Sequence, residues 1–359
     1  MNPKAAPPST SSKSAKARQP RARKGAPGLL DVAARAQVSG ATVSRSFTRP
    51  KTVKPQTRQR VMQAAAELGY IRDRMASGLH SRRSGTVGCI VPTIDNAIFS
   101  ELIEAFAQRL GEQERTMLIA SHDYDVQREV GIVRSLLERR IDGLALIGRE
   151  HDPVALEMLK LRDIPVVALW CTSGPTSIPV IGTDNRRAGY RITKHLLELG
   201  HRDIALLVPD TKHNDRAADR LDGIREALGE QGLTLPQQRL LTCPYDSLEA
   251  KQVALTLLQS VTPPSAIIGC NDVIAHGVLH AARKLRIDVP ENLSVVGIGD
   301  FKGSAAMEPE LTTMRLPARR IGRLAADHLC RPHTTRNVLP ADNIIESELI
   351  LRNSTARPS

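Results

Sequence analysis

The sequence lacks several features that would identify common protein classes. It has no apolar run of the roughly 18 to 20 residues that a membrane helix needs. Its first 28 residues contain seven Lys/Arg, no acid and no apolar core segment, so we do not expect them to form a secretory signal. The five cysteines are widely spread and no CxxC pair occurs. We therefore predict free thiols, a reducing cytoplasmic location and no membrane partner.

Motifs of the common enzyme classes are also absent. Neither a GxSxG nucleophile elbow nor a GxxxxGK[ST] phosphate loop occurs. Gly297, Gly299 and Gly303 follow a predicted strand, but their GxGxxxG spacing is longer than that of a dinucleotide-binding motif. His276 and His280 share a helix face, yet glycine rather than the glutamate of zinc proteases follows His276. We expect neither an enzyme nor a metal site, and no cofactor.

Positive charge is concentrated at the start of the chain. Residues 1–85 contain 18 Lys/Arg and three acids, whereas residues 86–359 contain 32 Lys/Arg and 35 acids. The whole net charge of +12 therefore comes from the first quarter of the sequence. This distribution predicts a polyanion-binding head on a near-neutral body. Residues 1–27, rich in proline, serine, lysine and arginine, are expected to form a disordered basic arm.

Residues 31–45 are the most informative segment. A first helix, a tight turn and a second helix fit a helix-turn-helix, whose second helix enters the DNA major groove. Ser39 can cap this second helix and, with Thr42, bind phosphates. Arg45 can bind guanine through two hydrogen bonds. A third helix is expected to begin at Pro55 and to end at Gly69.

Strand and helix patterns alternate after the head. The expected strands are 86–91, 116–120, 143–147, 165–170, 180–181, 204–208, 266–269 and 293–298, with helical patterns between most of them. This alternation predicts parallel sheets covered on both faces. The segment is longer than one sheet usually needs, so we expect two α/β lobes with a ligand site in the cleft between them.

The string D-V-A-x-x-A-x-V-S-x-x-T-V-S-R at residues 31–45 resembles the head signature of the LacI/GalR family of bacterial transcriptional repressors. The resemblance extends to about residue 350, through segments such as 67–71, 87–92 and 200–205. It implies a helix-turn-helix head with a hinge helix over 28–83, a two-lobed periplasmic-binding-protein-like body over 84–350, and a tail over 351–359. It also implies a homodimer, with a tetramer left open, on a near-palindromic operator of double-stranded DNA.

The resemblance also implies particular functional residues. Those expected to contact DNA are Leu29, Leu30, Ser39, Gly40, Ala41, Thr42, Ser44, Arg45, Thr57 and Leu79. The last of these is the residue that matches the family's minor-groove wedge. Those expected to contact an effector in the cleft are Asn96, Phe99, Arg149, His151, Trp170, Arg220, Asn271, Asp272, Asp300 and Lys302.

Some positions depart from the family pattern. Gln37 replaces the usual turn glycine, which predicts a left-handed residue and a loss of ~1 kcal/mol in head stability. Arg72 replaces a common proline before the hinge, and Gly78 lies within the hinge, so hinge folding is expected to depend more on DNA. Gly299 stands where the family has an acidic ligand residue.

We therefore predict a transcriptional regulator of the repressor type that controls carbohydrate or sugar-acid catabolism genes. Four of the expected cleft residues are basic and the usual acid is missing, which favours an anionic effector. Residues 149–153 and 307–309 resemble the gluconate-repressor branch, so gluconate or a ketogluconate is the favoured ligand. The body alone would also fit a solute-binding transport component, but the basic head argues against that class.

Overall fold

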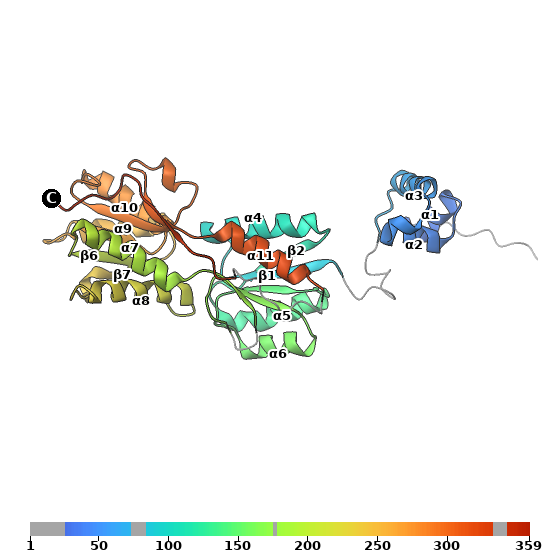
Figure 1. Ribbon diagram of the computed structural model, residues 1–359, viewed down its shortest axis with the longest axis horizontal. Helices are drawn as coiled ribbons and strands as arrows, with labels where there is room; N and C mark the ends of the chain where they lie inside the picture. Colours follow the sequence, from blue (N-terminus) through green and yellow to red (C-terminus); the bar gives the residue numbers. More distant parts are fainter. Residues whose placement is uncertain (1–25, 73–83, 175–177, 333–342) are drawn as a thin grey trace, which may run out of the picture. The chain divides into compact units, whose positions relative to one another are not determined.

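The computed structural model describes residues 26–72, 84–174, 178–332 and 343–359. The chain divides into two compact units, Met1–His80 and Ser81–Ser359, called the head and the body below (Figure 1). The predicted basic arm up to residue 25 and the predicted hinge, with Gly78 and Leu79, lie outside the described residues.

The head is a small bundle of three helices. They are α1 (Leu29–Arg35), α2 (Gly40–Thr48) and α3 (Pro55–Leu68), with a 3₁₀ turn at Pro50–Thr52. Each helix contributes one fully buried valine to the common core: Val32, Val43 and Val61, respectively. Gln37 has φ of 53°, so the predicted left-handed residue is present in the turn between α1 and α2. The helix-turn-helix prediction is confirmed.

The first lobe of the body contains a five-stranded parallel sheet in the order β2-β1-β3-β4-β5. The strands are β1 (Thr86–Val91), β2 (Thr116–Ser121), β3 (Leu144–Ile147), β4 (Val166–Leu169) and β5 (Val180–Ile181). Helices α5 (Glu129–Glu138) and α6 (Pro153–Leu161) cover one face. Helices α4 (Ala97–Glu112) and α11 (Ala318–Cys330) pack together on the other face, as Figure 1 shows.

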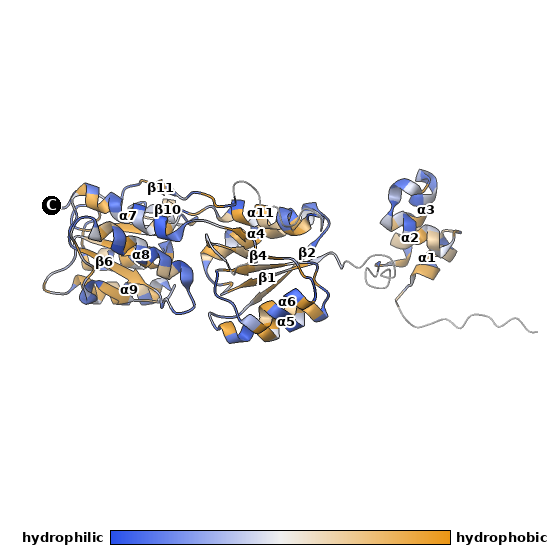
Figure 2. Cartoon of the chain, turned by 60° about the horizontal axis from the view of Figure 1, so that its bottom comes forward, coloured by the Kyte–Doolittle hydropathy of each residue, from blue (hydrophilic) through white to orange (hydrophobic). Residues whose placement is uncertain are grey.

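The second lobe contains a six-stranded sheet in the order β11-β10-β9-β8-β6-β7, parallel except for the β10–β11 pair. The strands are β6 (Ile204–Val208), β7 (Leu240–Thr242), β8 (Ala266–Gly269), β9 (Ser294–Gly299), β10 (Thr312–Arg315) and β11 (Glu348–Ile350). Helices α7 (Asn185–Leu199) and α8 (Asp215–Gly229) pack together, as do α9 (Ser247–Leu258) and α10 (Asp272–Leu285). Figure 2 shows apolar strands enclosed by helices with polar outer faces.

The chain passes between the two lobes more than once. It crosses after β5, crosses back after β10 to form α11 on the first lobe, and returns to β11. Where the first and last crossings meet, the Gly182 N–H donates to the Asn343 carbonyl at 2.8 Å. The predicted fold of a two-lobed α/β body with parallel sheets is confirmed, because each sheet has its own helical layers.

The predicted tail over 351–359 differs from the structure. Ser354 is fully buried. Its hydroxyl accepts a hydrogen bond from the Thr312 N–H at 2.8 Å and donates one to the Val295 carbonyl at 2.6 Å. These residues belong to the second lobe, because they satisfy backbone groups along β9 and β10. In the part of the chain that the structure describes, no helix has the length and apolarity to cross a membrane.

Candidate functional site

The exposed side of α2 is the candidate DNA-reading surface. Its first turn is fixed by Ser39, whose hydroxyl accepts the Thr42 N–H at 3.2 Å and lies 3.0 Å from the Thr42 hydroxyl. Ala41 and Arg45 are exposed and Ser44 is half-buried. Among the described residues no carboxylate forms an ion pair with Arg45. Its Nε donates to the Ala41 carbonyl of its own helix at 3.3 Å. Arg45 therefore presents on this helix a positive charge that no described carboxylate neutralises.

The other predicted DNA contacts surround this helix. A methyl group at Gly40 would lie 3.0 Å from a Leu29 methyl carbon, so glycine lets the start of α1 approach α2. Leu29 is half-buried against the head core, whereas Leu30 is 75% exposed. Thr57 is half-buried in the first turn of α3. The structure thus brings α1, α2 and the start of α3 together, each with at least one predicted contact.

In the body, five of the predicted effector residues meet in one small cavity of about 10 Å³, called the inner chamber below. It is lined by Asn96, Ile98, Phe99, Tyr124, Trp170, Arg216, Arg220, Tyr245 and Asn271. Both lobes contribute to this set, because Trp170 follows β4 of the first lobe and Asn271 follows β8 of the second. The chamber therefore lies at the carboxyl ends of parallel strands, as predicted for a ligand in an α/β fold.

Arg220 is the most strongly buried charge of the chamber, at 2% exposure. Its Nε donates to the Asn185 side-chain oxygen at 3.0 Å, and a terminal nitrogen donates to the Cys270 carbonyl at 2.8 Å. In the described chain no carboxylate forms an ion pair with Arg220. Both of these partners are neutral, so the buried guanidinium has hydrogen bonds but no opposite charge among the described residues.

Close packing of α7 on α8 places Arg220 beside Asn185. A methyl group at Gly223 would overlap the Arg186 carbonyl, and one at Gly189 would overlap the Arg220 carbonyl. Glycine at both positions lets the two helix backbones approach directly. The R-x-x-G spacing therefore positions Arg220 against the first turn of α7.

Two further donors in the chamber lack partners. The Trp170 indole nitrogen and the Asn271 amide nitrogen are buried, and neither has a hydrogen-bond partner among the described residues. The Asn271 oxygen already caps α10 by accepting the Ile274 N–H at 3.0 Å, which leaves only its amide group for a ligand. Trp170 has φ of 68°, a strained value for a bulky residue. Unpaired buried donors and local strain are typical of ligand sites.

Two tyrosines of the chamber wall, and the thiol of Cys270 next to Asn271 in the sequence, complete the chemistry of this region. Burial raises the pKa of Tyr124 and of Tyr245, so both hydroxyls stay neutral and able to donate at ordinary pH. Burial also raises the pKa of the Cys270 thiol, which makes it a poor nucleophile. The chamber thus offers hydrogen-bond donors rather than a general base or a reactive sulfur.

A larger cavity of about 740 Å³ adjoins the chamber and shares Tyr124 and Tyr245 with it. Its wall includes residues 124–127 and 151–153 of the first lobe and 209–210 and 212–214 of the second. His151 lies in this wall, but its side chain is only 1% exposed. Its ring nitrogens lie 2.8 Å from a Glu129 carboxylate oxygen and 3.1 Å from the Gly148 carbonyl. These contacts within the first lobe occupy both ring nitrogens of His151, which limits its predicted role in binding a ligand.

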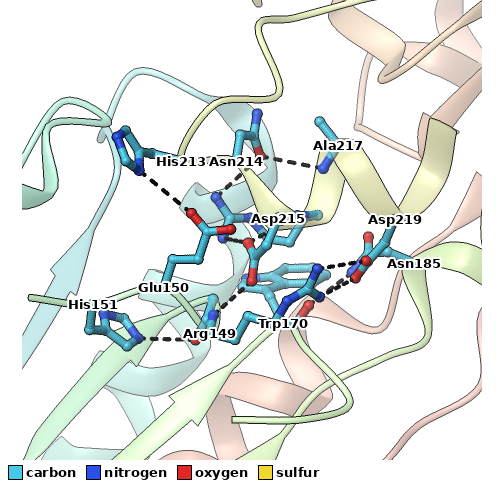
Figure 3. Close-up of polar contacts among 12 residues, drawn as sticks. Arg149, Glu150, His151, Trp170, Asn185, His213, Asn214, Asp215, Ala217 and Asp219 are labelled. Carbon is cyan, nitrogen blue, oxygen red and sulfur yellow. Dashed lines mark hydrogen bonds and ion pairs between the residues drawn. The ribbon is translucent and has the colours of Figure 1, made fainter. Parts of the chain in front are cut away.

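Arg149 joins the lobes instead of lining the chamber (Figure 3). Its two terminal nitrogens donate to the two Asp219 carboxylate oxygens at 2.7 and 2.9 Å. Its backbone N–H donates to Asp215 at 2.7 Å. Beside it, Glu150 lies 3.5 Å from His213 of the other lobe. We call the Arg149–Asp219 pair the interlobe latch.

The remaining predicted effector residues lie outside the chamber. Asp272 is fully buried and accepts from the Phe301 N–H and from the hydroxyls of Ser304 and Thr313, at 2.5 to 2.9 Å. Asp300 pairs with Arg315 and Arg352, and Lys302 is exposed. None of these three lines the cavities described above. Asp272 and Asp300 link the β9 end to its neighbours in the second lobe.

Sequence reasoning did not select Ile98, Tyr124, Arg216 or Tyr245. Arg216 had a usable signal, because it lies one helical turn before Arg220 on α8 and faces the same side. Its terminal nitrogen pairs with Asp215 at 2.5 Å. The tyrosines follow β2 and β7, and the latter strand is too short to stand out in the sequence.

Comparison with known proteins gave family matches for both units. Residues 28–73 match the model described as bacterial regulatory proteins, lacI family, and residues 193–355 match the periplasmic binding protein-like domain. The transcriptional regulator GntR of Pseudomonas aeruginosa is 32% identical over 332 residues, covering 92% of this chain and 96% of the relative.

Solved structures give the same result. The lac repressor dimer bound to operator and the anti-inducer ONPF has a TM-score of 0.80 and 26% identity, covering 92% of this chain and all of that one. The regulator CelR in complex with cellobiose has a TM-score of 0.67 and 26% identity, covering 91% of this chain and 99% of that one. Both matches span the head and the body.

Proposed function

Because this chain belongs to the LacI family of bacterial transcriptional regulators, we propose that its body binds a sugar acid, such as gluconate or a ketogluconate, and that this binding changes the operator affinity of its head. The chain is a DNA-binding regulator with a helix-turn-helix head and is not an enzyme.

The observation that carries the anionic effector is the uncompensated charge of Arg220. A guanidinium that is 2% exposed and has only neutral protein partners loses hydration without gaining an opposite charge. A carboxylate from a ligand supplies that charge through charge-assisted hydrogen bonds. A neutral sugar would leave the charge buried and unpaired.

The remaining chamber groups suit the hydroxyl part of a sugar acid. The unpartnered Trp170 and Asn271 nitrogens donate to oxygen acceptors, and the indole ring offers a face for carbon-bound hydrogens. CelR, a structural relative, is solved with the sugar cellobiose. A chamber of about 10 Å³ holds only about one water, so a six-carbon ligand also occupies the adjoining cavity past Tyr124 and Tyr245.

Of the four basic residues that the sequence places near the cleft, only one keeps an uncompensated charge in the chamber. Arg149 is neutralised by Asp219, His151 bonds Glu129, and Lys302 lies outside the chamber. Arg220 remains, so the proposal rests on this residue alone.

For the head, we propose that α2 enters the major groove of an operator bound by a homodimer. Arg45 is the expected base reader, because it is exposed on α2 and no described carboxylate neutralises it. Loss of one bidentate base contact costs about 1 to 3 kcal/mol and relaxes specificity at one base pair.

Titration calorimetry with gluconate and with sorbitol, its neutral counterpart, tests the effector. The wild type is expected to bind gluconate more tightly, and Arg220→Met is expected to lose that preference. Nuclease protection on genomic DNA, with and without gluconate, tests the regulatory step, and Arg45→Ala is expected to lose the protected site. Equal binding of the two ligands would remove the anionic assignment, and an unchanged footprint with bound gluconate would remove the regulatory role of that ligand.

A further inference from the structure

We propose that Asn185 determines the charge selectivity of the inner chamber, by bonding Arg220 through a neutral amide where an aspartate of the same shape would neutralise it. This inference rests on the proposed function, since it concerns the same chamber and the same anionic ligand. It assigns a specificity-determining role to a residue that does not itself line the chamber.

The Asn185 side chain uses both of its ends. It is 2% exposed, and it begins α7 at the crossing between the lobes. Its oxygen accepts the Arg220 Nε–H at 3.0 Å, and its amide nitrogen donates to the Trp170 carbonyl at 2.8 Å. A flipped amide would set its NH₂ group against the guanidinium and its oxygen against the carbonyl, so the two partners fix its orientation.

The contrast with neighbouring arginines shows what the amide does. Arg149 faces Asp219 and Arg216 faces Asp215, so each of these guanidinium groups has its counter-ion in the protein. Arg220 lies on the same helix as Arg216, yet it meets an amide oxygen. The chamber is therefore left one negative charge short, and the ligand is the remaining source of that charge.

Asn185 also connects this charge to the indole of Trp170. The hydrogen bond to the Trp170 carbonyl holds that residue in its left-handed conformation, beside the chamber. Removing the amide altogether is expected to weaken binding of any ligand by misplacing both Trp170 and Arg220. It leaves the positive charge of Arg220 without a counter-ion, however, so the preference for an anion persists. Loss of position and loss of selectivity are thus separable.

The experiment compares Asn185→Asp with Asn185→Ala, using gluconate and sorbitol as probes in titration calorimetry on the full chain. The wild type is expected to favour gluconate by roughly 10- to 100-fold, as for one charge-assisted contact. Asn185→Asp is expected to reduce this ratio below about threefold, because Arg220 then has its own carboxylate. Asn185→Ala is expected to weaken both ligands and to keep the ratio within about threefold of the wild type.

Each result decides between the proposals. A selective wild type with an equally selective Asn185→Asp variant overturns the role of Asn185 and leaves the sugar-acid effector standing. A wild type without preference for gluconate overturns the proposed effector, and the role of Asn185 with it. If Asn185→Asp does not fold, Asn185→Ala still decides, because loss of the gluconate preference in this variant would show that Asn185 acts only by position.

Discussion

The interlobe latch makes the strongest prediction about how the body moves. Arg149 follows β3 of the first lobe, Asp219 lies on α8 of the second, and two nitrogen–oxygen contacts of 2.7 and 2.9 Å join them. Asp219→Asn keeps the shape of the side chain and removes its charge. We expect this change to raise the population of molecules in which the lobes are apart.

The magnitude follows from the exposure of the pair. The Arg149 and Asp219 side chains are 33% and 22% exposed, between a surface pair and a buried one. Exposed pairs contribute about 0.2 to 1 kcal/mol, whereas breaking a buried pair costs about 3 to 5 kcal/mol. A bidentate pair of intermediate exposure is therefore expected to contribute about 1 to 2 kcal/mol, or roughly a 5- to 30-fold change in the open population.

Hydrogen exchange at the Arg149 backbone N–H provides the assay. This N–H donates to Asp215 across the cleft, so it exchanges when the lobes separate. Asp219→Asn should raise its exchange rate by roughly 5- to 30-fold. Glu226→Gln is the matched control: it breaks an ion pair of 2.7 Å with Arg186 within the second lobe and should leave this exchange unchanged. Unchanged protection in Asp219→Asn, or equal acceleration in the control, would refute the latch.

Two further predictions concern stability. Gln37→Gly relieves a left-handed glutamine with φ of 53° and should stabilise the head by ~1 kcal/mol, whereas Gly69→Ala, at φ of 64°, should destabilise it. Thermal unfolding of residues 26–72 followed by circular dichroism checks both signs, and a destabilised Gln37→Gly would contradict the argument. Ser354→Ala leaves the Thr312 N–H and a β9 carbonyl without their partner, so the body should lose about 2 to 3 kcal/mol. Denaturant unfolding measures that loss, and a midpoint equal to the wild type would mean that the last residues are a free tail.

The hydrophobic pattern of the sequence was sufficient to predict the bounds of several strands that alternate with helices. The strands β1, β5, β6 and β8 have the predicted bounds, because each is a short apolar run buried in the middle of its sheet or between turn signals. The strands β7, β10 and β11 were not predicted from the sequence. They contain three or four residues each, and β10 (Thr312–Arg315) is mostly polar, so its burial depends on neighbours that are distant in the sequence.

The chamber was predictable to the extent that its residues follow strand ends or a helix motif. Asn96, Trp170 and Asn271 follow β1, β4 and β8, and the fold brings these ends together. The role of Arg149 was not predictable, because its partner Asp219 is 70 positions away and no local pattern links them. A basic residue near a cleft can bind a ligand or an acid of the protein, and only the three-dimensional contacts distinguish these cases.

Helix α8 connects the latch with the chamber. Asp215 and Asp219 lie one turn apart and bind the first lobe through the backbone and side chain of Arg149. Arg216 and Arg220 lie one turn apart on the adjoining face and line the chamber. Because a helix of this length moves as a unit, a ligand that pulls on the arginines also shifts the aspartates against the other lobe. We therefore expect ligand binding to change the stability of the latch, and loss of the latch to change ligand affinity by the same factor.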